Sequence, residues 1–130
     1  MPKPTIFQLD AIDWVDERRE ENPAPAEMIA EAEKSGARRK RLANGESGYF
    51  SQYTTMPPGF EVPAHSHSHD ELFIVLSGGC VLTTGGKAVE LTARDSAALA
   101  ADHEYGFVVG PEGLEFMVVR PGAAQSNFGD

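Results

Sequence analysis

The residues best placed to do chemistry form a histidine cluster near the middle of the chain. Three of the four histidines fall within five residues, 65–69, and Glu71 follows two positions later. In an extended strand the side chains at positions i and i+2 share one face, so His65 and His67 point the same way. Two imidazoles on one face with a carboxylate close by suit divalent metals such as Fe, Mn, Ni, Cu or Zn. With open coordination positions, this ligand set also activates O2 on non-haem iron.

The position of the cluster favours a metal site over an exposed polar loop. The cluster follows a proline–glycine turn and leads directly into the apolar run 72–76, which is expected to be the most buried strand. Imidazoles placed there would cost free energy unless they were paired or bound to a metal. The sequence therefore predicts that this region binds one divalent transition metal ion.

Length and composition indicate one globular domain. The chain has 130 residues, 41% of them hydrophobic, which is enough for a single core. Its net charge of -9 gives a surface that repels phosphate backbones and anionic lipids, so we expect neither a nucleic-acid nor a membrane partner. No apolar stretch is long enough for a signal peptide or a membrane span. The single cysteine, Cys80, is interpreted as a buried core thiol, and a cytoplasmic location is expected.

Two regions of different character are expected. Residues 1–36 are acidic and interrupted by prolines, and they predict an N-terminal arm with a short helix over residues 26–34 that ends near Gly36. Trp14 is expected either to hold this arm against the main body or to cover the mouth of a pocket. Residues 37–130 are predicted to form the main body.

The main body consists of short β-type runs separated by glycine and proline turns, a rhythm typical of a sandwich or barrel. The expected strands are 49–56, 71–76, 80–84, 87–91, 96–100, 105–109 and 114–120. The run 72–76 is apolar at every position, so both of its faces should be covered. One face can point into a barrel. The other needs a second sheet, the N-terminal arm or a partner subunit, and a homodimer is the preferred interpretation.

The histidine cluster also resembles a known motif. The stretch Gly59-(x5)-His65-x-His67-(x3)-Glu71-(x6)-Gly78 matches the first motif of the cupin superfamily at every defining position. The resemblance implies an all-β fold, a double-stranded β-helix or jelly-roll barrel, with a metal ion such as Fe, Mn, Ni or Zn inside. It also implies that His65, His67 and Glu71 are three of the usual four protein ligands.

The second cupin motif, Gly-(x5)-Pro-x-Gly-(x2)-His-(x3)-Asn, normally supplies the fourth ligand through its histidine. In the best alignment none of its five defining positions is retained, since they hold Arg94, Ala100, Asp102, Tyr105 and Val109. Tyr105 thus stands where the resemblance expects a histidine. This departure leaves the fourth ligand open.

Three residues are candidates to complete the site. His103 lies two positions before Tyr105 with the same strand parity, and would be the fourth ligand if a turn shifted the register. Tyr105 would fill the slot as a ligand or as a hydrogen-bonding pocket residue. Alternatively, His69 joins the first two histidines and leaves Glu71 nearby as an acid–base group. The plain alternatives are an aromatic core residue for Tyr105 and an exposed turn residue for His103.

Two further features have open interpretations. The basic run 38–41 is most simply a solvated surface that balances the acidic arm, but alternation along a strand would point one pair of cations inward, where they could hold an acidic substrate. Asp95 resembles the acidic residue that precedes the second motif, and a role in a turn is expected for it.

These observations favour a metalloenzyme that acts on a small organic molecule. Two histidines and a carboxylate leave room on the metal for O2 and substrate, so a dioxygenase is slightly favoured over an isomerase, an epimerase or a lyase. Tyr105 and Glu71 are the candidate catalytic residues, and Tyr105 or His103 would orient substrate or move a proton. The alternatives are a non-catalytic, metal-containing binding or sensing module, and a barrel whose metal only stabilises the fold.

Overall fold

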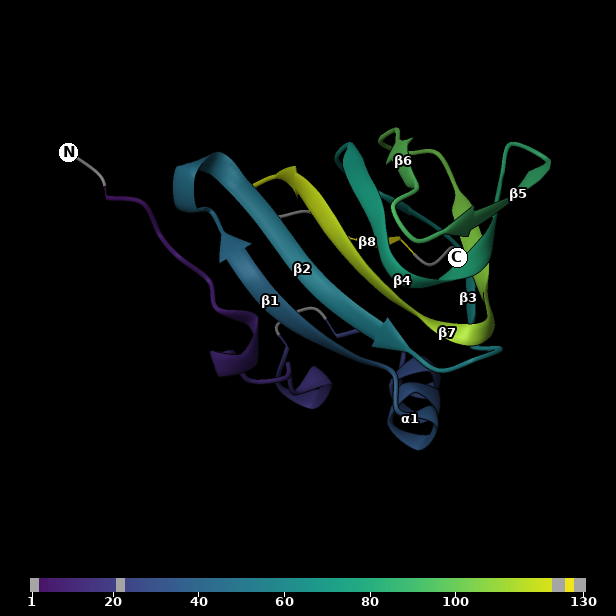
Figure 1. The fold of residues 1–130 in the computed structure, drawn as a ribbon, viewed down its shortest axis with the longest axis horizontal. Helices are drawn as coiled ribbons and strands as arrows, with labels where there is room; N and C mark the ends of the chain where they lie inside the picture. The colour runs from purple at the N-terminus through teal and green to yellow at the C-terminus, as the bar shows by residue number, and fades with distance from the viewer. Residues whose placement is uncertain (1–2, 21–22, 123–125, 128–130) are drawn as a thin grey trace.

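The computed structural model describes residues 3–20, 23–122 and 126–127 of the chain (Figure 1). In chain order the elements are η1 (Leu9–Ala11), η2 (Glu17–Arg19), α1 (Ala26–Ser35), β1 (Arg38–Asn44), η3 (Glu46–Gly48), β2 (Tyr49–Met56), β3 (Glu61–His67), β4 (Glu71–Thr84), β5 (Lys87–Thr92), β6 (Ser96–Leu99), β7 (Tyr105–Pro121) and β8 (Ser126–Asn127). The η elements are short 3-10 helices, and the strand pairings among the described residues are antiparallel.

The strands form two layers that share their two longest members. The second half of β7 pairs with β2, which pairs with β1, and the first half of β7 pairs with β3. Strand β4 pairs along β7, with β6 beside its first half and β5 beside its second half. One layer therefore runs β1-β2-β7-β4-β6 and the other β8-β3-β7-β4-β5. This is the predicted jelly-roll barrel, and the predicted short helix of the arm is present.

Glycines bend the two long strands from one layer into the other. Gly78 of β4 and Gly113 of β7 have φ angles of 72° and 77°, and a Cβ atom on Gly78 would lie 1.9 Å from the Gly113 carbonyl oxygen. From sequence, four separate runs are expected at these places. Instead, the pairing of β4 with β7 continues through the bend with irregularities in register. The glycines bend the strands rather than end them, because they accept backbone geometry and contacts that a side chain would prevent.

An aromatic cluster forms the centre of the barrel core. Phe73 and Phe116 stack with ring centroids 4.6 Å apart, and Phe107 packs against both at 5.5 and 5.7 Å. Phe73 and Val75 are fully buried while Leu72 and Leu76 of the same strand are exposed. Alternate side chains of β4 thus face inward, as the pleat of a strand requires.

Cys80 lies in this core with 2% of its surface exposed, which confirms its predicted burial. Burial raises the pKa of the thiol to about 11, so the reactive thiolate is scarce at neutral pH. We expect iodoacetamide to leave the native protein unmodified at neutral pH and to alkylate Cys80 fully once guanidinium has unfolded the chain. Mass spectrometry measures both reactions, and alkylation of the native protein at the rate of the unfolded chain would contradict this expectation.

The N-terminal arm covers part of the edge strand β1. Its helix α1 ends at Gly36, which adopts the left-handed conformation with φ of 93°, as the sequence predicts. Closer to the N-terminus, the backbone N–H of Val15 donates to the carbonyl oxygen of Arg39 at 2.8 Å. This bond occupies one of the open hydrogen-bonding positions on the edge of the sheet. The division between arm and barrel after residue 36 stays a prediction.

Trp14 holds the arm on the outer face of the barrel. The guanidinium carbon of Arg38 and the Nζ atom of Lys40 lie 4.2 and 4.7 Å from the indole ring centroid, and Tyr53 packs beside the ring at 6.2 Å between centroids. Trp14 is not among the residues that line the cavity described below. Of its two expected roles, the structure shows the one that fastens the arm to the main body.

Apolar side chains remain exposed on the outer face of the barrel. Leu72, Leu76, Val81 and Val108 are each between 40% and 44% exposed, so the described part of the chain leaves them uncovered. The homodimer expected to cover the outer face of residues 72–76 stays a prediction. Across the described ranges, no helix is long and apolar enough to cross a membrane.

Candidate active site

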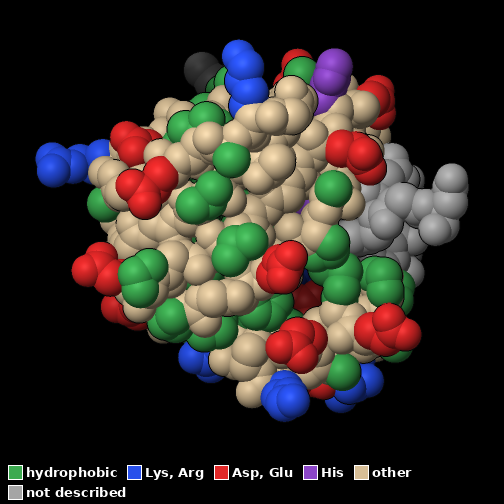
Figure 2. Space-filling model, turned by 90° about the vertical axis from the view of Figure 1, so that its right-hand side faces the viewer, with side chains coloured by type: hydrophobic (Ala, Val, Ile, Leu, Met, Phe, Trp, Pro, Cys, Tyr) green, Lys and Arg blue, Asp and Glu red, His purple; other side chains and the backbone are tan. Residues whose placement is uncertain are grey.

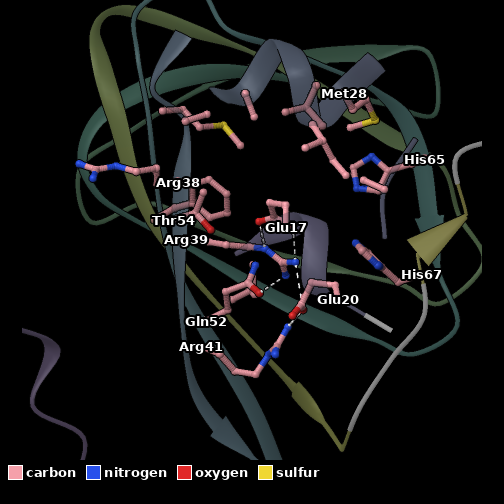
Figure 3. Close-up of a pocket in the computed structure, with 18 of the residues that line it drawn as sticks. Glu17, Glu20, Met28, Arg38, Arg39, Arg41, Gln52, Thr54, His65 and His67 are labelled. Atoms are coloured by element: carbon pink, nitrogen blue, oxygen red, sulfur yellow. Dashed lines mark hydrogen bonds and ion pairs between the residues drawn. The ribbon is translucent and has the colours of Figure 1, made fainter. Parts of the chain in front are cut away.

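A cavity of about 820 Å³ lies between the barrel strands and the N-terminal arm. Strands β1, β2, β3, β4 and β7 contribute to its walls, and α1, η2 and adjoining loop residues line the rest. Four residues that the sequence singles out line this one cavity: His65, His67, Glu71 and Tyr105. In the close-up of Figure 3, His65 and His67 lie on one wall and face arginines of β1 across the cavity.

A bulge in β3 aims the two histidines into the cavity. The register between β3 and β7 shifts between Val62 and His65. Residues three positions apart in a regular strand face opposite sides, but this bulge lets Val62 and His65 both be buried on the inner side. Gly106 of β7 permits this close approach, because a Cβ atom there would lie 2.8 Å from the Val62 carbonyl oxygen. The imidazoles of His65 and His67 are 5.0 Å apart between centroids, with their planes at 88°.

The backbone fixes the tautomer of His65. Its Nδ1 atom lies 2.9 Å from the carbonyl oxygen of Pro63, and because a carbonyl oxygen can only accept, Nδ1 carries the proton. Burial lowers the pKa of this imidazole, which favours the neutral ring. Nε2 is then the basic nitrogen, and metal-ligating histidines commonly hold their other nitrogen in such a hydrogen bond.

His67, Glu71, Tyr105 and Arg120 meet inside the barrel. His67 Nε2 lies 3.0 Å from the Tyr105 hydroxyl oxygen and 3.0 Å from Glu71 Oε2, and Arg120 Nη1 lies 3.6 Å from that same carboxylate oxygen. All four residues are less than one tenth exposed. Burial raises the pKa of Glu71 to about 7, although the Arg120 guanidinium opposes this effect. Burial also raises the pKa of Tyr105, so its phenol is protonated at neutral pH.

Three residues that line the cavity each have a buried polar atom that makes no hydrogen bond to any described residue. These atoms are Thr54 Oγ1, Glu71 Oε2 and Arg120 Nε. Glu71 Oε2 instead faces the His67 ring nitrogen at 3.0 Å and the Arg120 guanidinium at 3.6 Å. Native proteins leave few buried polar groups unpaired, and those that remain often face an ion, a water molecule or a ligand. This wall therefore offers a hydroxyl, a carboxylate oxygen and a guanidinium N–H to an occupant of the cavity.

The donor set fits a divalent transition metal ion in its chemistry. Two imidazoles and a carboxylate suit such ions, and the unbonded Glu71 oxygen beside the His67 nitrogen is an arrangement that a metal ion would complete. As the side chains are placed, however, the described residues contain no group of three or more His, Cys, Asp or Glu positioned to hold an ion. The ligand set of His65, His67 and Glu71 therefore stays a prediction.

The segment that replaces the second motif keeps the backbone shape that glycine normally provides. Arg94 and Asp102, which stand at two glycine positions of the motif, have φ angles of 80° and 63°. Their N–H groups donate to the carbonyl oxygens of Val75 and His67 at 2.9 and 2.8 Å. These bonds tie the segment to the strands on both sides of the site, and Tyr105 then reaches the cavity from the position of the missing histidine.

The other two candidate ligands lie elsewhere. His69 and His103 are exposed, and neither lines the cavity. His69 Nδ1 lies 3.0 Å from the hydroxyl oxygen of Ser68, and His103 lies in the connection between β6 and β7. Asp95 has its predicted role in a turn, because its carboxylate accepts from the backbone N–H of Thr92 at 2.8 Å.

Arg120 and Thr54 are site residues that sequence reasoning missed. Thr54 belongs to β2, whose inward-facing parity cannot be inferred from a run that mixes aromatic and polar residues on both faces. Arg120 had a usable signal, since Phe116 and Val118 precede it at alternate positions and all three side chains are buried. Alternation along β7 therefore places a guanidinium at the inward end of an apolar row.

Ion pairs join the arm to β1 at the cavity. Arg39 holds the Glu17 carboxylate through both oxygens, with Nε–Oε2 at 2.5 Å and Nη2–Oε1 at 2.7 Å, and its Nη1 donates to Gln52 Oε1 at 2.7 Å. Arg41 donates to Glu20, and this hydrogen bond lowers the pKa of the Glu20 carboxyl. Of the two interpretations of the basic run, the structure shows an inward pair, Arg39 and Arg41 (Figure 3).

The protein is thus a jelly-roll barrel with a buried polar cluster inside it, in which one oxygen of Glu71 and one nitrogen of Arg120 make no hydrogen bond to a described residue. Residues 52–120 match the model of the Cupin_2 family, a cupin domain, and the chain belongs to the cupin family. Proteins of this family commonly bind a transition metal, and its enzymes act on small molecules.

Individual relatives share part of the sequence or the whole fold. A dimethylsulfoniopropionate lyase, DddW, from Ruegeria pomeroyi is 36% identical over 59 residues, which cover 45% of this chain but only 39% of the lyase. The structure of KdgF from Halomonas sp. superposes with a TM-score of 0.70 at 20% identity, covering 93% of this chain and 96% of KdgF. A sugar phosphate isomerase of the cupin superfamily from Silicibacter pomeroyi gives 0.69 at 21% identity, covering 97% and 82%. At these identities the two structures show the fold alone.

Proposed function

We propose that the chain is a metal-dependent lyase that acts on a small organic molecule. The observation that carries this proposal is the meeting of His67, Glu71 and Tyr105 at a cavity where three buried polar atoms make no hydrogen bond to a described residue. The partial similarity to a dimethylsulfoniopropionate lyase supports the class of reaction. It favours a lyase over the dioxygenase that the ligand types alone suggest.

Three side chains would hold the metal ion: His65 through Nε2, His67 through Nε2, and Glu71 through its unbonded oxygen. Fe, Mn, Ni and Zn all accept these donors. When bound, the ion supplies a Lewis acid that polarises an oxygen atom of the substrate.

The remaining side chains of the cavity would orient the substrate and manage a proton. The Tyr105 hydroxyl is buried and protonated beside His67, so it can donate a hydrogen bond to an oxygen atom of the substrate. In an elimination the same oxygen, once ionised, would take the proton from the substrate carbon, and the C–H electron pair would form the double bond as the leaving group departs. Arg120 and Thr54 have unpaired polar atoms that can fix an oxygen-rich group. The neighbouring Phe107, Phe116 and Val118 line the same cavity and give it an apolar wall beside these polar groups.

Turnover of small organic acids by metal-loaded protein tests the proposal, and dimethylsulfoniopropionate is the first substrate to try. We expect protein reconstituted with one of the four metals to release dimethyl sulfide, which gas chromatography measures. A Tyr105→Phe variant should lose at least about 100-fold in kcat, the usual contribution of a positioned acid or base, while its bound metal is retained.

The matched control is Tyr53→Phe. This change also removes a hydrogen-bonded phenolic hydroxyl, here one that donates to the Glu115 carboxylate, but Tyr53 does not line the cavity. Its activity should stay within about twofold of the wild type, because no group near the substrate changes. Equal losses in the two variants would show that Tyr105 acts on the fold and not on the reaction.

A dioxygenase is the second candidate, because two histidines and a carboxylate are the ligand types that leave open positions for O2. Substrate-dependent O2 uptake by Fe(II)-loaded protein, without elimination products, would favour it over the lyase. Saturable binding of an organic acid with no turnover by any metal form would favour the non-catalytic binding module. A cytoplasmic location and a homodimer belong to the same proposal.

A further inference from the structure

Part of the cavity wall is cationic although the protein as a whole is acidic. Arg39 and Arg41 on β1 and Arg120 on β7 line the cavity. Among the described residues, Glu71 is the one Asp or Glu that the strands contribute to its lining. The net charge of the chain is -9, and Figure 2 shows acidic side chains spread over one face with Lys and Arg at its margins. A cationic cavity in an otherwise acidic protein indicates that the cavity binds an anionic ligand.

The arm supplies two carboxylates to this cationic wall. Glu17 meets Arg39 through two contacts, the fork arrangement in which a guanidinium binds any carboxylate most strongly. Glu20 contacts Arg41 and also lies 3.4 Å from Arg39 Nη2. Figure 3 shows both glutamates pointing into the cavity toward the two arginines. The two arginines thus already hold carboxylate groups inside the cavity.

These carboxylates reach the cavity from outside the barrel. Trp14 packs on the outer face, Val15 bonds to the edge of β1, and Glu17 lies in the cavity two residues later. The four partners of the ion pairs remain 21% to 32% exposed, so water reaches them. A ligand carboxylate can replace an arm carboxylate in the same contact, so each guanidinium exchanges one carboxylate partner for another.

We propose that Arg39 and Arg41 bind the carboxylate groups of a small organic ligand, and that Glu17 and Glu20 occupy this site while no ligand is bound. Arg120, whose buried Nε has no hydrogen bond to a described residue, extends the cationic wall toward Glu71. An acidic substrate held at β1 would have its reacting part directed to the histidine side of the cavity. Carboxylate binding would make small organic acids the substrate class of the proposed enzyme. Turnover of such acids rests on the proposed function, whereas their binding does not.

Calorimetric titration of small carboxylates tests the proposal on the full 130-residue chain. The probes are acetate, malonate, succinate and glutarate, with succinamide as an uncharged control. Every protein is prepared in the same metal state. A Glu17→Gln/Glu20→Gln variant should bind at least one of the four carboxylates at least tenfold more tightly than the wild type, because the competing internal carboxylates are gone. Adding Arg39→Gln and Arg41→Gln to this variant should abolish that binding, and circular dichroism checks that the fold remains.

The matched control is Glu31→Gln/Glu33→Gln, which changes the net charge equally. Both residues are exposed on α1, and Glu33 pairs with Arg18 outside the cavity. This control should bind carboxylates as the wild type does. A gain of less than tenfold for all four carboxylates, or an equal gain in the control, would overturn the inference and leave the ion pairs as fasteners of the arm. Absence of turnover with binding intact would count against the proposed lyase alone.

Discussion

A His65→Ala/His67→Ala double variant is expected to lose its divalent metal ion and keep its fold. Wild-type protein, purified without a nickel column and incubated with Fe, Mn, Ni or Zn salts, should hold about one ion per chain, since His65, His67 and Glu71 are proposed as one ligand set. Removing both imidazoles leaves Glu71 as the one predicted ligand, and a single carboxylate in a buried site cannot replace them. The metal content, measured by elemental mass spectrometry, should therefore fall from about one ion per chain to near zero.

The His69→Ala/His103→Ala variant is the matched control for this experiment. It removes the same number of imidazoles, but both of these residues are exposed and lie outside the cavity. Its metal content should equal that of the wild type. If it loses metal as well, one of the exposed histidines is a ligand. If the wild type binds no metal under any of these conditions, the buried histidines are better explained as polar groups of a metal-free binding pocket.

The histidine side of the site was predictable because it is local in sequence. His65, His67 and Glu71 span seven positions, and strand alternation alone is enough to place the two histidines on one face. The rest of the site depends on closure of the barrel. Arg120 reaches Glu71 only because β7 pairs with β4, and Glu17 reaches Arg39 only because the arm crosses the edge of β1. Contacts between such distant segments have no signature in residue spacing.

The second motif shows a different limit of sequence reasoning. Every defining residue type is absent, yet Arg94 and Asp102 hold the positive φ angles that glycine would allow without strain. The turn geometry is thus supplied by tertiary hydrogen bonds to Val75 and His67. Glycine has the least strain at positive φ, so its presence in a sequence can indicate that conformation. Here the surrounding structure holds an arginine and an aspartate in the same conformation, and the sequence gives no sign of it. The side chain that the motif positions, Tyr105, still enters the cavity.

A Gly78→Ala variant is expected to fold poorly or not at all. Gly78 is the last residue of the histidine motif, and it lies where β4 and β7 bend together. A methyl group there would sit 1.9 Å from the Gly113 carbonyl oxygen and 2.7 Å from its carbonyl carbon, both backbone atoms that cannot rotate away. Relief would require separating the two strands that belong to both layers. We expect a loss of more than about 4 kcal/mol, an exceptional value for one substitution and a large part of the roughly 5–15 kcal/mol that stabilises a domain.

Gly59→Ala separates this clash from backbone strain. Gly59 has a φ of 76°, close to the 72° of Gly78, but a Cβ atom on it would meet nothing within 4 Å. Its substitution should therefore cost only about 1–2 kcal/mol, the penalty for a left-handed residue with a side chain. Denaturant titration of both variants measures the difference. If the two losses are equal, positive φ explains the glycine at both positions. If Gly78→Ala costs far more, that glycine is required because two long strands must cross between layers in contact, which makes it a determinant of the barrel on which the site is built.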